Sequence, residues 1–242
     1  MAATYFVADA HLGFGSLDDE LTKEKSLVQF LHRVADTAES LYILGDLFNF
    51  WFEYASVIPR KHIRILLALR ELTDRGVDVH YLAGNHDFWL GDFFPHDLGV
   101  RVYTEPIDVT IDGKRFWISH GDGLMKKDRG YRLLKRVLRN PLSVRLYGLL
   151  HPDLAFGTAA FFAKLSRKHP AFPDRDSDYI EAAEEKFNQG FDCVVLAHTH
   201  SPLFREKDGH TYVNTGDWMR YFTYAVFEKG KMTLERWPGV RR

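Results

Sequence analysis

The sequence predicts an α/β protein in which helices cover a layered β-sheet. Short apolar runs alternate with longer segments of helical periodicity, which is typical of strands that alternate with covering helices. The composition agrees, since 45% hydrophobic and 27% charged residues over 242 positions are typical of a folded chain. The length fits one large domain or a domain that carries an insertion.

Five apolar runs are expected to form strands of this sheet. They cover residues 4–9, 41–45, 79–83, 115–119 and 192–197. Runs of this kind, separated by segments with helical periodicity, favour a sheet whose strands are joined through helices.

Two segments, 17–38 and 57–76, are expected to form helices that cover the sheet. In the first, one helical face carries Leu27, Phe30, Leu31 and Val34. In the second, one face carries Ile63, Leu66, Leu67 and Leu69. An apolar stripe of this period indicates a helix with one buried face, and Gly76 is expected to end the second helix.

Residues 210–237 are expected to form further strands. Their apolar runs are short, and a Lys-Gly pair at 229–230 suits a tight turn between two of them. We therefore expect an antiparallel meander here, and with it a second sheet.

The segment 122–172 differs from the rest in composition and is expected to be a helical insertion in a core made of residues 1–121 and 173–242. Eight Lys or Arg residues and one acid, Asp128, lie between Lys126 and Arg145, and residues 146–165 are almost wholly apolar. The insertion could be a hairpin with its apolar side on the core and its cations in solvent. It could instead be a cap whose basic side meets phosphate and whose apolar side meets an oily molecule.

The net charge and the cysteine content indicate which partners the protein could bind and in which cellular compartment it is expected. A net charge of −1 gives no global reason to expect nucleic-acid binding. The single cysteine, Cys193, cannot form an intramolecular disulfide, and the chain begins without a basic region and long apolar stretch. We therefore expect a cytoplasmic protein. Any contact with a membrane is expected to be at the membrane surface, because no segment has the ~20 consecutive apolar residues of a spanning helix.

All five expected strands deliver a metal-ligand type of side chain at or just beyond their carboxyl ends. The set is Asp9, His11, Asp46, Asn85, His120, His198 and His200. In α/β sheets this edge is where sites are built. Carboxylate, imidazole and amide oxygen together suit Mn²⁺, Fe²⁺ or Zn²⁺, and seven ligands suit two ions bridged by a carboxylate and a water.

Each piece also has a purely structural interpretation. An Asp-x-His at a strand end can cap a helix, "GNHD" is a good turn, and "HTH" can be two surface histidines. The presence of five such motifs in one chain favours a metal site. The alternative is a degenerate scaffold that kept the fold, lost the metals and serves only as a binding module.

The motifs "DAH", "GD", "GNHD", "HGD" and "AHTH", in this order from Asp9 to His200, resemble the signature of the calcineurin-like metallophosphoesterases. The resemblance implies a four-layer αββα sandwich with a dinuclear centre. The first metal would be held by Asp9, His11, Asp46 and His200, and the second by Asp46, Asn85, His120 and His198. It further implies that His86 stabilises the transition state or protonates the leaving oxygen, and that Asp87 orients His86.

Within that superfamily, "LYILGDLFNFW", "GNHDFWLGDFF" and "HGDGLMKKDRGYRLLKRVLRNP" resemble the UDP-2,3-diacylglucosamine pyrophosphohydrolases of lipid A synthesis. The implied reaction is attack of a metal-bridging hydroxide on the α-phosphorus, giving UMP and 2,3-diacylglucosamine 1-phosphate. The implied substrate contacts are Asn85, His86, Asp128 and His198. His86 stands where the best-known enzymes of this group carry arginine, and residues 166–179 do not match the group's substrate-binding helix.

The cap composition fits such a substrate. Its cations could meet pyrophosphate or lipid headgroups, and residues 146–165 could shelter acyl chains during peripheral contact with the cytoplasmic face of the inner membrane. Two divalent ions, with Mn²⁺ preferred over Fe²⁺ or Zn²⁺, are the expected cofactors. A different phosphodiester, a nucleotide pyrophosphate or a phosphoprotein remains an alternative substrate on the same metal core.

Overall fold

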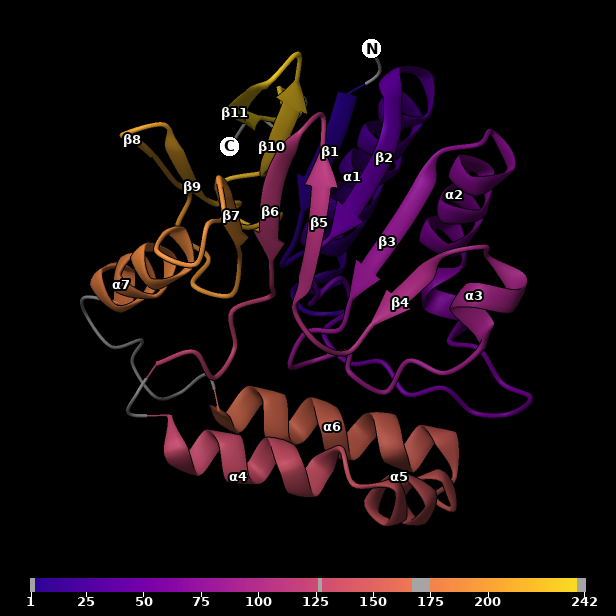
Figure 1. Cartoon of the computed structure of the whole chain (residues 1–242). Coiled ribbons are helices and arrows are strands. Elements are labelled where there is room, and N and C mark those ends of the chain that lie inside the picture. Colours follow the sequence, from indigo (N-terminus) through magenta and orange to yellow (C-terminus); the bar gives the residue numbers. More distant parts are fainter. Residues whose placement is uncertain (1–2, 126–127, 167–174, 239–242) are drawn as a thin grey trace.

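Two β-sheets face each other at the centre of the fold, and helices cover both outer faces (Figure 1). The computed structural model describes residues 3–125, 128–166 and 175–238. The order of layers is helices, sheet, sheet, helix. The expected four-layer αββα sandwich is confirmed.

The first sheet has six strands in the order β11-β10-β1-β2-β3-β4. They are β1 (Ala3–Val7), β2 (Ala38–Ile43), β3 (Asp78–Leu82), β4 (Arg101–Tyr103), β10 (Thr223–Glu228) and β11 (Lys231–Arg236). Strands β1 to β4 run parallel, whereas β10 is antiparallel to both β1 and β11. The carboxyl ends of β1, β2 and β3 therefore meet at one edge.

The second sheet has five strands in the order β5-β6-β7-β9-β8. They are β5 (Ile107–Ile111), β6 (Lys114–Ile118), β7 (Cys193–Leu196), β8 (Leu203–Lys207) and β9 (His210–Asn214). The central strands β6, β7 and β9 are parallel, and β5 and β8 are antiparallel edges.

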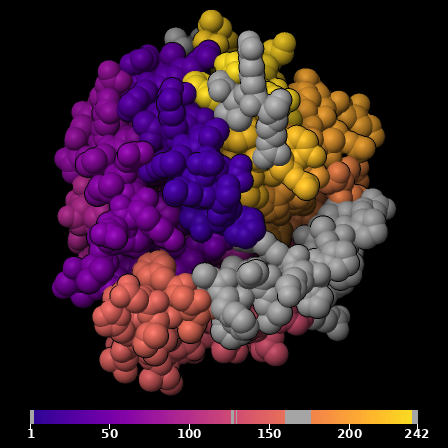
Figure 2. Space-filling model, turned by 180° about the vertical axis from the view of Figure 1, so that it is seen from behind, coloured from indigo at the N-terminus to yellow at the C-terminus, as the bar shows by residue number. Residues whose placement is uncertain are grey.

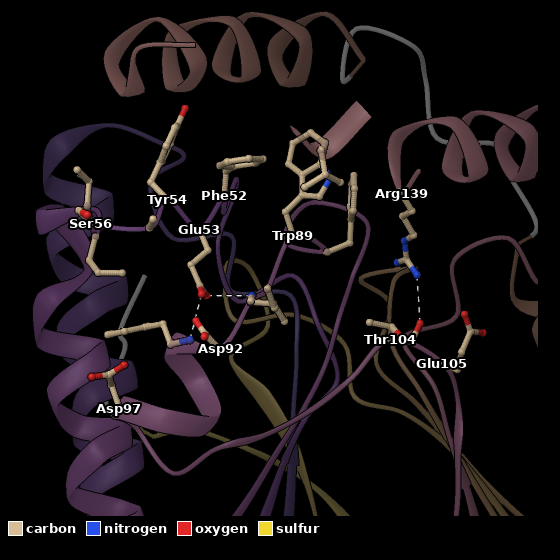
Figure 3. A pocket seen from close by; sticks show the side chains of 18 residues that line it. Phe52, Glu53, Tyr54, Ser56, Trp89, Asp92, Asp97, Thr104, Glu105 and Arg139 are labelled. Carbon is tan, nitrogen blue, oxygen red and sulfur yellow. Dashed lines mark hydrogen bonds between the residues drawn. The ribbon is translucent and has the colours of Figure 1, made fainter. Parts of the chain in front are cut away.

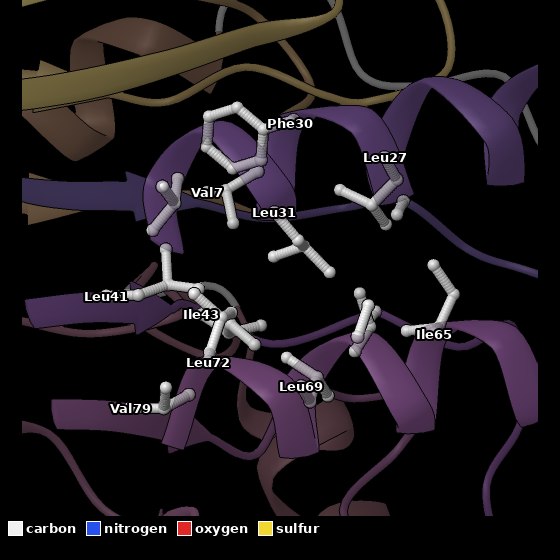
Figure 4. Packing of buried hydrophobic residues seen from close by; sticks show 14 of the residues in the cluster. Val7, Leu27, Phe30, Leu31, Leu41, Ile43, Ile65, Leu69, Leu72 and Val79 are labelled. Carbon is white, nitrogen blue, oxygen red and sulfur yellow. The ribbon is translucent and has the colours of Figure 1, made fainter. Parts of the chain in front are cut away.

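Three apolar clusters hold the layers together. The first lies between the first sheet and helices α1 (Leu17–Thr37) and α2 (Ile63–Asp74), as Figure 4 shows. The second lies between the two sheets, where Phe6, Phe116 and Phe227 pack. The third lies between the second sheet and α7 (Arg175–Phe187), where Tyr179 is fully buried. Successive residues of one strand serve different layers because strand side chains alternate between faces.

The five expected strands are present as β1, β2, β3, β6 and β7, and the first expected helix is α1, whose predicted apolar face is buried. The second helix differs from the prediction. Ile58 is not helical because Pro59 disfavours helix in the residue before it. A 3₁₀ turn (Arg60–His62) follows, and the α-helix begins at Ile63. Its buried face carries Ile65, Leu66 and Leu69. Ile63 and Leu67, which were expected on that face, are exposed.

The prediction of a single antiparallel meander over residues 210–237 is wrong. Strands β10 and β11 do form a hairpin, with positive φ angles of 52° at Lys229 and 75° at Gly230, but they belong to the first sheet. Strand β9 belongs to the second sheet and pairs parallel with β7. The short elements β4, β5, β8 and α3 (Phe93–Asp97), and helix α7, were not predicted. Several are edge strands with exposed residues, which leave little apolar periodicity.

Helices α4 (Arg129–Leu138), α5 (Pro141–Gly148) and α6 (Pro152–Ser166), here called the cap, lie beyond the sheet edge where β1, β2 and β3 end (Figure 1). Aromatic rings join the cap to the core: Tyr147 stacks on Trp89 at 4.8 Å between ring centroids, and Phe156 meets Phe50 at 5.2 Å. The Trp89 indole N–H also donates to the Leu138 carbonyl. Residues 126–127 and 167–174, which fall within the expected insertion or at its end, lie outside the described residues.

Candidate metal centre

The seven expected ligands follow β1, β2 and β3 of the first sheet and β6 and β7 of the second, at the end of the sandwich that faces the cap. Five of them have left-handed backbone conformations, with φ between 42° and 70°: Asp9, His11, Asp46, His198 and His200. Non-glycine residues adopt this region rarely, and such residues concentrate at functional sites. The backbone conformation of the turns after the strands thus sets the direction of the candidate ligand side chains.

The loops that carry the ligands touch each other closely. A Cβ on Gly84 would lie 2.1 Å from Asp46 Oδ1, and a Cβ on Gly45 would lie 2.7 Å from the Gly84 backbone. Both positions therefore require glycine, which explains why "LGD" and "AGNHD" each have a glycine shortly before their ligand.

One group of ligands joins Asp9, His11 and His200, whose potential ligand atoms all lie within 4.8 Å of one another. His11 Nε2 is 3.5 Å from Asp9 Oδ1, and His200 Nε2 is 3.8 Å from the same oxygen. The other Asp9 oxygen, Oδ2, accepts the backbone N–H of His198. Oδ1 is left facing the two imidazoles.

A second group joins Asp46, His120 and His198. His120 Nε2 is 3.5 Å from Asp46 Oδ2, 3.2 Å from His198 Nδ1 and 3.0 Å from Asn85 Oδ1. Asp46 Oδ2 is also 3.5 Å from His11 Nε2. One oxygen of Asp46 therefore faces both groups, which is the position of a bridging ligand.

The donor atoms fit a pair of divalent cations. Asp9 Oδ1, both ring nitrogens of His11 and His200 Nδ1 are buried without a hydrogen-bond partner. Buried polar groups are normally hydrogen-bonded, so an unsatisfied cluster in a native fold calls for an explanation such as a bound ion. Carboxylates and imidazoles at this spacing are suitable ligands for Mn²⁺, Fe²⁺ or Zn²⁺.

The electrostatics keep this cluster in a ligating state. Burial opposes ionisation of both carboxyls, but the surrounding histidines outweigh it and hold the pKa values of Asp9 and Asp46 below the usual range. Burial lowers the pKa of His11 to about 4, so its ring is neutral at neutral pH. For His120, burial is outweighed by Asp46 and Asp9, which raise its pKa to about 9. A metal cation would replace that proton.

The ligands are held by neighbours that the sequence did not single out. His120 Nδ1 lies 2.7 Å from the Leu44 carbonyl, which fixes the ring with Nε2 toward Asp46. The buried ammonium of Lys23 donates to the carbonyls of His11 and Phe14 and pairs with Glu20. The loop after β1 is therefore tied to helix α1.

The structure gives Asp87 a role different from the expected one. The His86 ring is oriented by the Asn49 carbonyl, 3.0 Å from Nδ1, and not by Asp87. Asp87 is fully buried and accepts the backbone N–H groups of Asp46, Phe48 and Gly84 and the hydroxyl of Tyr81. Burial, with Asp46 close by, raises its pKa to about 6. Asp87 thus positions the two ligand loops rather than the imidazole.

His86 itself lies at the site. Its backbone N–H donates to Asp46 Oδ1, and its ring is grouped with His11 and Asp46 within 4.8 Å. Since Nδ1 is engaged by Asn49, Nε2 is the nitrogen free to meet a ligand.

His62 supports the loop that follows Asp46 and gives the protein a pH-dependent stability. Its buried ring packs on Phe48 at 4.6 Å, and burial lowers its pKa to about 3 from an ordinary 6.5. Between these values the unfolded chain takes up a proton that the folded chain excludes, so stability falls with falling pH by at most about 1.4 kcal/mol per unit. Above pH 6.5 the group contributes nothing.

His62→Leu is expected to lose this term. Urea unfolding at about pH 7 and about pH 5.5 would show a loss of about 1–2 kcal/mol on acidification in the parent beyond that in the variant. The exposed His32→Leu serves as the control and should follow the parent. Equal losses in all three proteins would contradict a proton-excluding His62.

A hollow of about 340 Å³ opens beside His120 and is lined by cations of the cap. Arg132, Lys135, Arg136 and Arg139 share one face of α4 and its C-cap, and all four line this hollow. Lys135 also pairs with Asp122 of "HGD" at 2.7 Å. The basic face of α4 therefore points toward the candidate metal centre.

The opposite face of α4 is apolar and exposed: Leu133, Leu134 and Val137 are each more than half exposed. The polarity of this helix is the reverse of that of an ordinary surface helix. Of the two interpretations of the insertion, the arrangement of α4 matches the cap with a basic inner side.

A larger hollow of about 960 Å³ lies between the cap and the core, and Figure 3 shows its lining. Phe52, Phe88 and Trp89 contribute rings to it, and the Glu53 carboxylate accepts the N–H groups of Gly91 and Phe93. Thr104, Glu105 and Arg139 line both hollows. The two are therefore neighbours, one basic and one partly aromatic.

Asp128 is the N-cap residue of α4, and its side chain makes no capping hydrogen bond. It does not line either hollow described above. Its expected substrate contact stays a prediction.

Asp217 was missed by the sequence analysis. It is buried, and its Oδ2 is 3.7 Å from His200 Nδ1. A signal was present: "HTYVNTGD" ends in a carboxylate just beyond strand β9, which is parallel to β7 and ends at the same edge.

Comparison with known proteins gives consistent results. The sequence model of the calcineurin-like phosphoesterases matches residues 3–202. The UDP-2,3-diacylglucosamine hydrolase of Porphyromonas gingivalis is 34% identical, over 96% of this chain and 96% of that protein. Those of Nitrosococcus oceani and Aeromonas salmonicida are 32% and 31% identical, over 90% and 97% of this chain and 88% and 93% of theirs.

Proposed function

The chain belongs to the calcineurin-like phosphoesterase family, and from this we propose that it is a metal-dependent hydrolase of UDP-2,3-diacylglucosamine. The reaction would place the oxygen of water on the α-phosphorus and break the anhydride bond, giving UMP and 2,3-diacylglucosamine 1-phosphate. Residues 1–121 and 173–242 would form the catalytic core, and residues 122–172 would form its cap.

One observation carries the proposal: Oδ2 of Asp46 lies 3.5 Å from His11 of one group of candidate ligands and 3.5 Å from His120 of the other. Asp9, His11, Asp46 and His200 would hold one metal, and Asp46, Asn85, His120 and His198 the other. Two divalent ions, in our proposal Mn²⁺, would activate water near neutral pH and neutralise charge on the phosphoryl oxygens.

The surrounding residues would bind and orient the substrate. His86 would present Nε2 to the phosphoryl group or the leaving oxygen, because the Asn49 carbonyl holds Nδ1. Asn85 and His198 would contact the phosphate next to the metals. The guanidinium and ammonium groups of Arg132, Lys135 and Arg136 would attract the diphosphate into the basic hollow.

The neighbouring hollow suits the apolar part of such a substrate. Its rings, Phe52, Phe88 and Trp89, lie beside the basic hollow, so a diphosphate at the metals would place its acyl chains toward them. A soluble nucleotide would leave this aromatic surface unused.

The test is an assay of the purified protein with Mn²⁺ on UDP-2,3-diacylglucosamine, beside a generic aryl phosphodiester. We expect release of UMP that depends on the acyl chains and stops when a chelator removes the metal. Turnover of the aryl ester alone, with no release of UMP, would support the metal centre but contradict UDP-2,3-diacylglucosamine as the substrate.

We further propose that the outer face of the cap contacts lipid from the cytoplasmic side of the inner membrane. No helix in the described ranges is long and apolar enough to cross a membrane. Exposed leucines nevertheless gather on α4 and α5, with Leu133 62%, Leu146 59% and Leu149 82% exposed. Part of the cap, in coral, forms the lower edge of the molecule in Figure 2. Exposed leucines on the cap, with arginines nearby, suit an anionic bilayer surface.

Replacing Leu133, Leu146 and Leu149 together with glutamine should therefore weaken binding to vesicles of anionic phospholipid. Three leucines that become buried in the bilayer would contribute several kcal/mol, so a loss of at least tenfold in partitioning is expected. Co-sedimentation measures it. Leu67→Gln, equally exposed on α2 but away from the cap, is the control. Unchanged partitioning of the triple variant would rule out the cap as the lipid-binding face.

A further inference from the structure

Asp217 stands behind His200 on the side away from Asp9. It is 1% exposed and follows strand β9, at the same sheet edge as the candidate ligands. The next residue, Trp218, donates its backbone N–H to the Asp9 carbonyl, and its fully buried indole donates to the Ser26 hydroxyl. The loop that carries Asp217 is thus fixed to both the metal-site loop and the core.

The two oxygens of Asp217 have different environments. Oδ1 accepts three backbone N–H groups, from Met219 at 3.2 Å, Arg220 at 2.7 Å and Tyr221 at 2.9 Å. Oδ2 is buried, has no hydrogen-bond partner and lies 3.7 Å from His200 Nδ1, which is also buried and unpartnered. The carboxylate is held rigidly by one oxygen while the other faces the imidazole.

His200 has less support of its own. Its side chain is 35% exposed, and it stacks on His11 at 5.0 Å between ring centroids. Its other nitrogen, Nε2, is 3.8 Å from Asp9 Oδ1. A small rotation of the ring would shorten the distance between His200 Nδ1 and Asp217 Oδ2 and let Nδ1–H donate a hydrogen bond to that oxygen.

We infer that Asp217 is a positioning residue of the metal centre: it accepts a hydrogen bond from the Nδ1–H of His200 and so keeps the Nε2 lone pair toward Asp9 Oδ1, where a metal would bind. The inference rests on the proposed function. Carboxylates behind metal-binding histidines set the ring orientation and tautomer, and their loss lowers metal affinity by about 10–100-fold.

Asp217→Asn is the sharpest variant. An amide oxygen can still accept from Met219, Arg220 and Tyr221, but the amide NH₂ then faces His200 and favours the tautomer with the proton on Nε2. Titration with Mn²⁺, followed by calorimetry, should show one of two ions bound about 10–100-fold more weakly. Asp153→Asn, on the exposed start of α6, should bind both ions as the parent does.

A double-mutant cycle separates positioning from a general structural role. In a His200→Ala background, Asp217→Asn should change manganese affinity less than twofold by our estimate, because no imidazole remains to be oriented. An equal loss in both backgrounds would assign Asp217 to the loop alone and overturn the inference. Unchanged affinity in the single variant would overturn it as well.

A measurement on the unmodified protein guards against variants that fail to fold. Nitrogen NMR of the zinc-loaded protein should show His200 protonated at Nδ1, and protonation at Nε2 would contradict the inference. An unmodified protein that binds no divalent metal would instead overturn the proposed function, and the role of Asp217 with it.

Discussion

Asp46→Ala is expected to destroy the dinuclear centre and abolish hydrolysis. Its Oδ2 faces both groups of imidazoles, at 3.5 Å from His11 and from His120, so in our proposal its removal takes a ligand from each metal. Two-metal stabilisation is worth several kcal/mol, and a loss of turnover on the order of 10³-fold or more follows. Metal analysis should find fewer than two manganese ions per chain.

Two controls frame this result. Asp153→Ala removes an exposed carboxylate of the cap and should leave both metal content and turnover unchanged. Asp46→Asn keeps an acceptor for the His86 N–H but loses the charge, and it should also fail to hold both ions. Full manganese occupancy in the Asp46→Ala variant would contradict the assignment of Asp46 as the bridging ligand.

His86→Ala is expected to slow turnover while leaving the metals in place. The ring is fixed through Nδ1 by Asn49, and its role in our proposal is to stabilise charge on the phosphoryl group. Loss of one such preorganised group lowers the rate roughly 10²–10³-fold. The fall should appear in kcat, measured with the lipid substrate at saturating Mn²⁺.

The metal content of the His86 variant is the decisive second readout, since a nitrogen of this ring lies within 4.8 Å of candidate ligand atoms of His11 and Asp46. Two ions per chain with slow turnover would support a role in transition-state stabilisation. Loss of an ion would make His86 a ligand instead. His96→Ala, an exposed histidine on α3, should behave as the parent.

Much of this site could be predicted from the sequence because strands and their ends leave a local signal. Each apolar run leads directly into a candidate ligand, as in "LYILGD", which ends on Asp46, and "DCVVLAHTH", which contains His198 and His200. Parallel strands end at one edge, so ligands on separate strands meet without any distance being known. How the two sheets face each other has no such local signal: the backbone N–H of His198, after β7 of the second sheet, donates to the Asp9 carboxylate, after β1 of the first sheet, across 189 positions.

Other features were decided only by the tertiary structure. The partner of the His86 ring is the Asn49 carbonyl rather than Asp87. Every residue has a backbone carbonyl, so the sequence does not show which one accepts this hydrogen bond. The pairing of β9 with β7, which brings Asp217 to His200, depends on which sheet a late strand joins.

Helix α4 shows the same division most clearly. Its periodicity separates Arg132 and Lys135 from Leu133 and Val137, and the sequence by itself determined that these are opposite faces. Which face turns inward was decided by the tertiary structure: the cations line the hollow beside His120, and the leucines are exposed. Periodicity fixes which side chains lie together, but the environment of a face depends on neighbours that are distant in the chain.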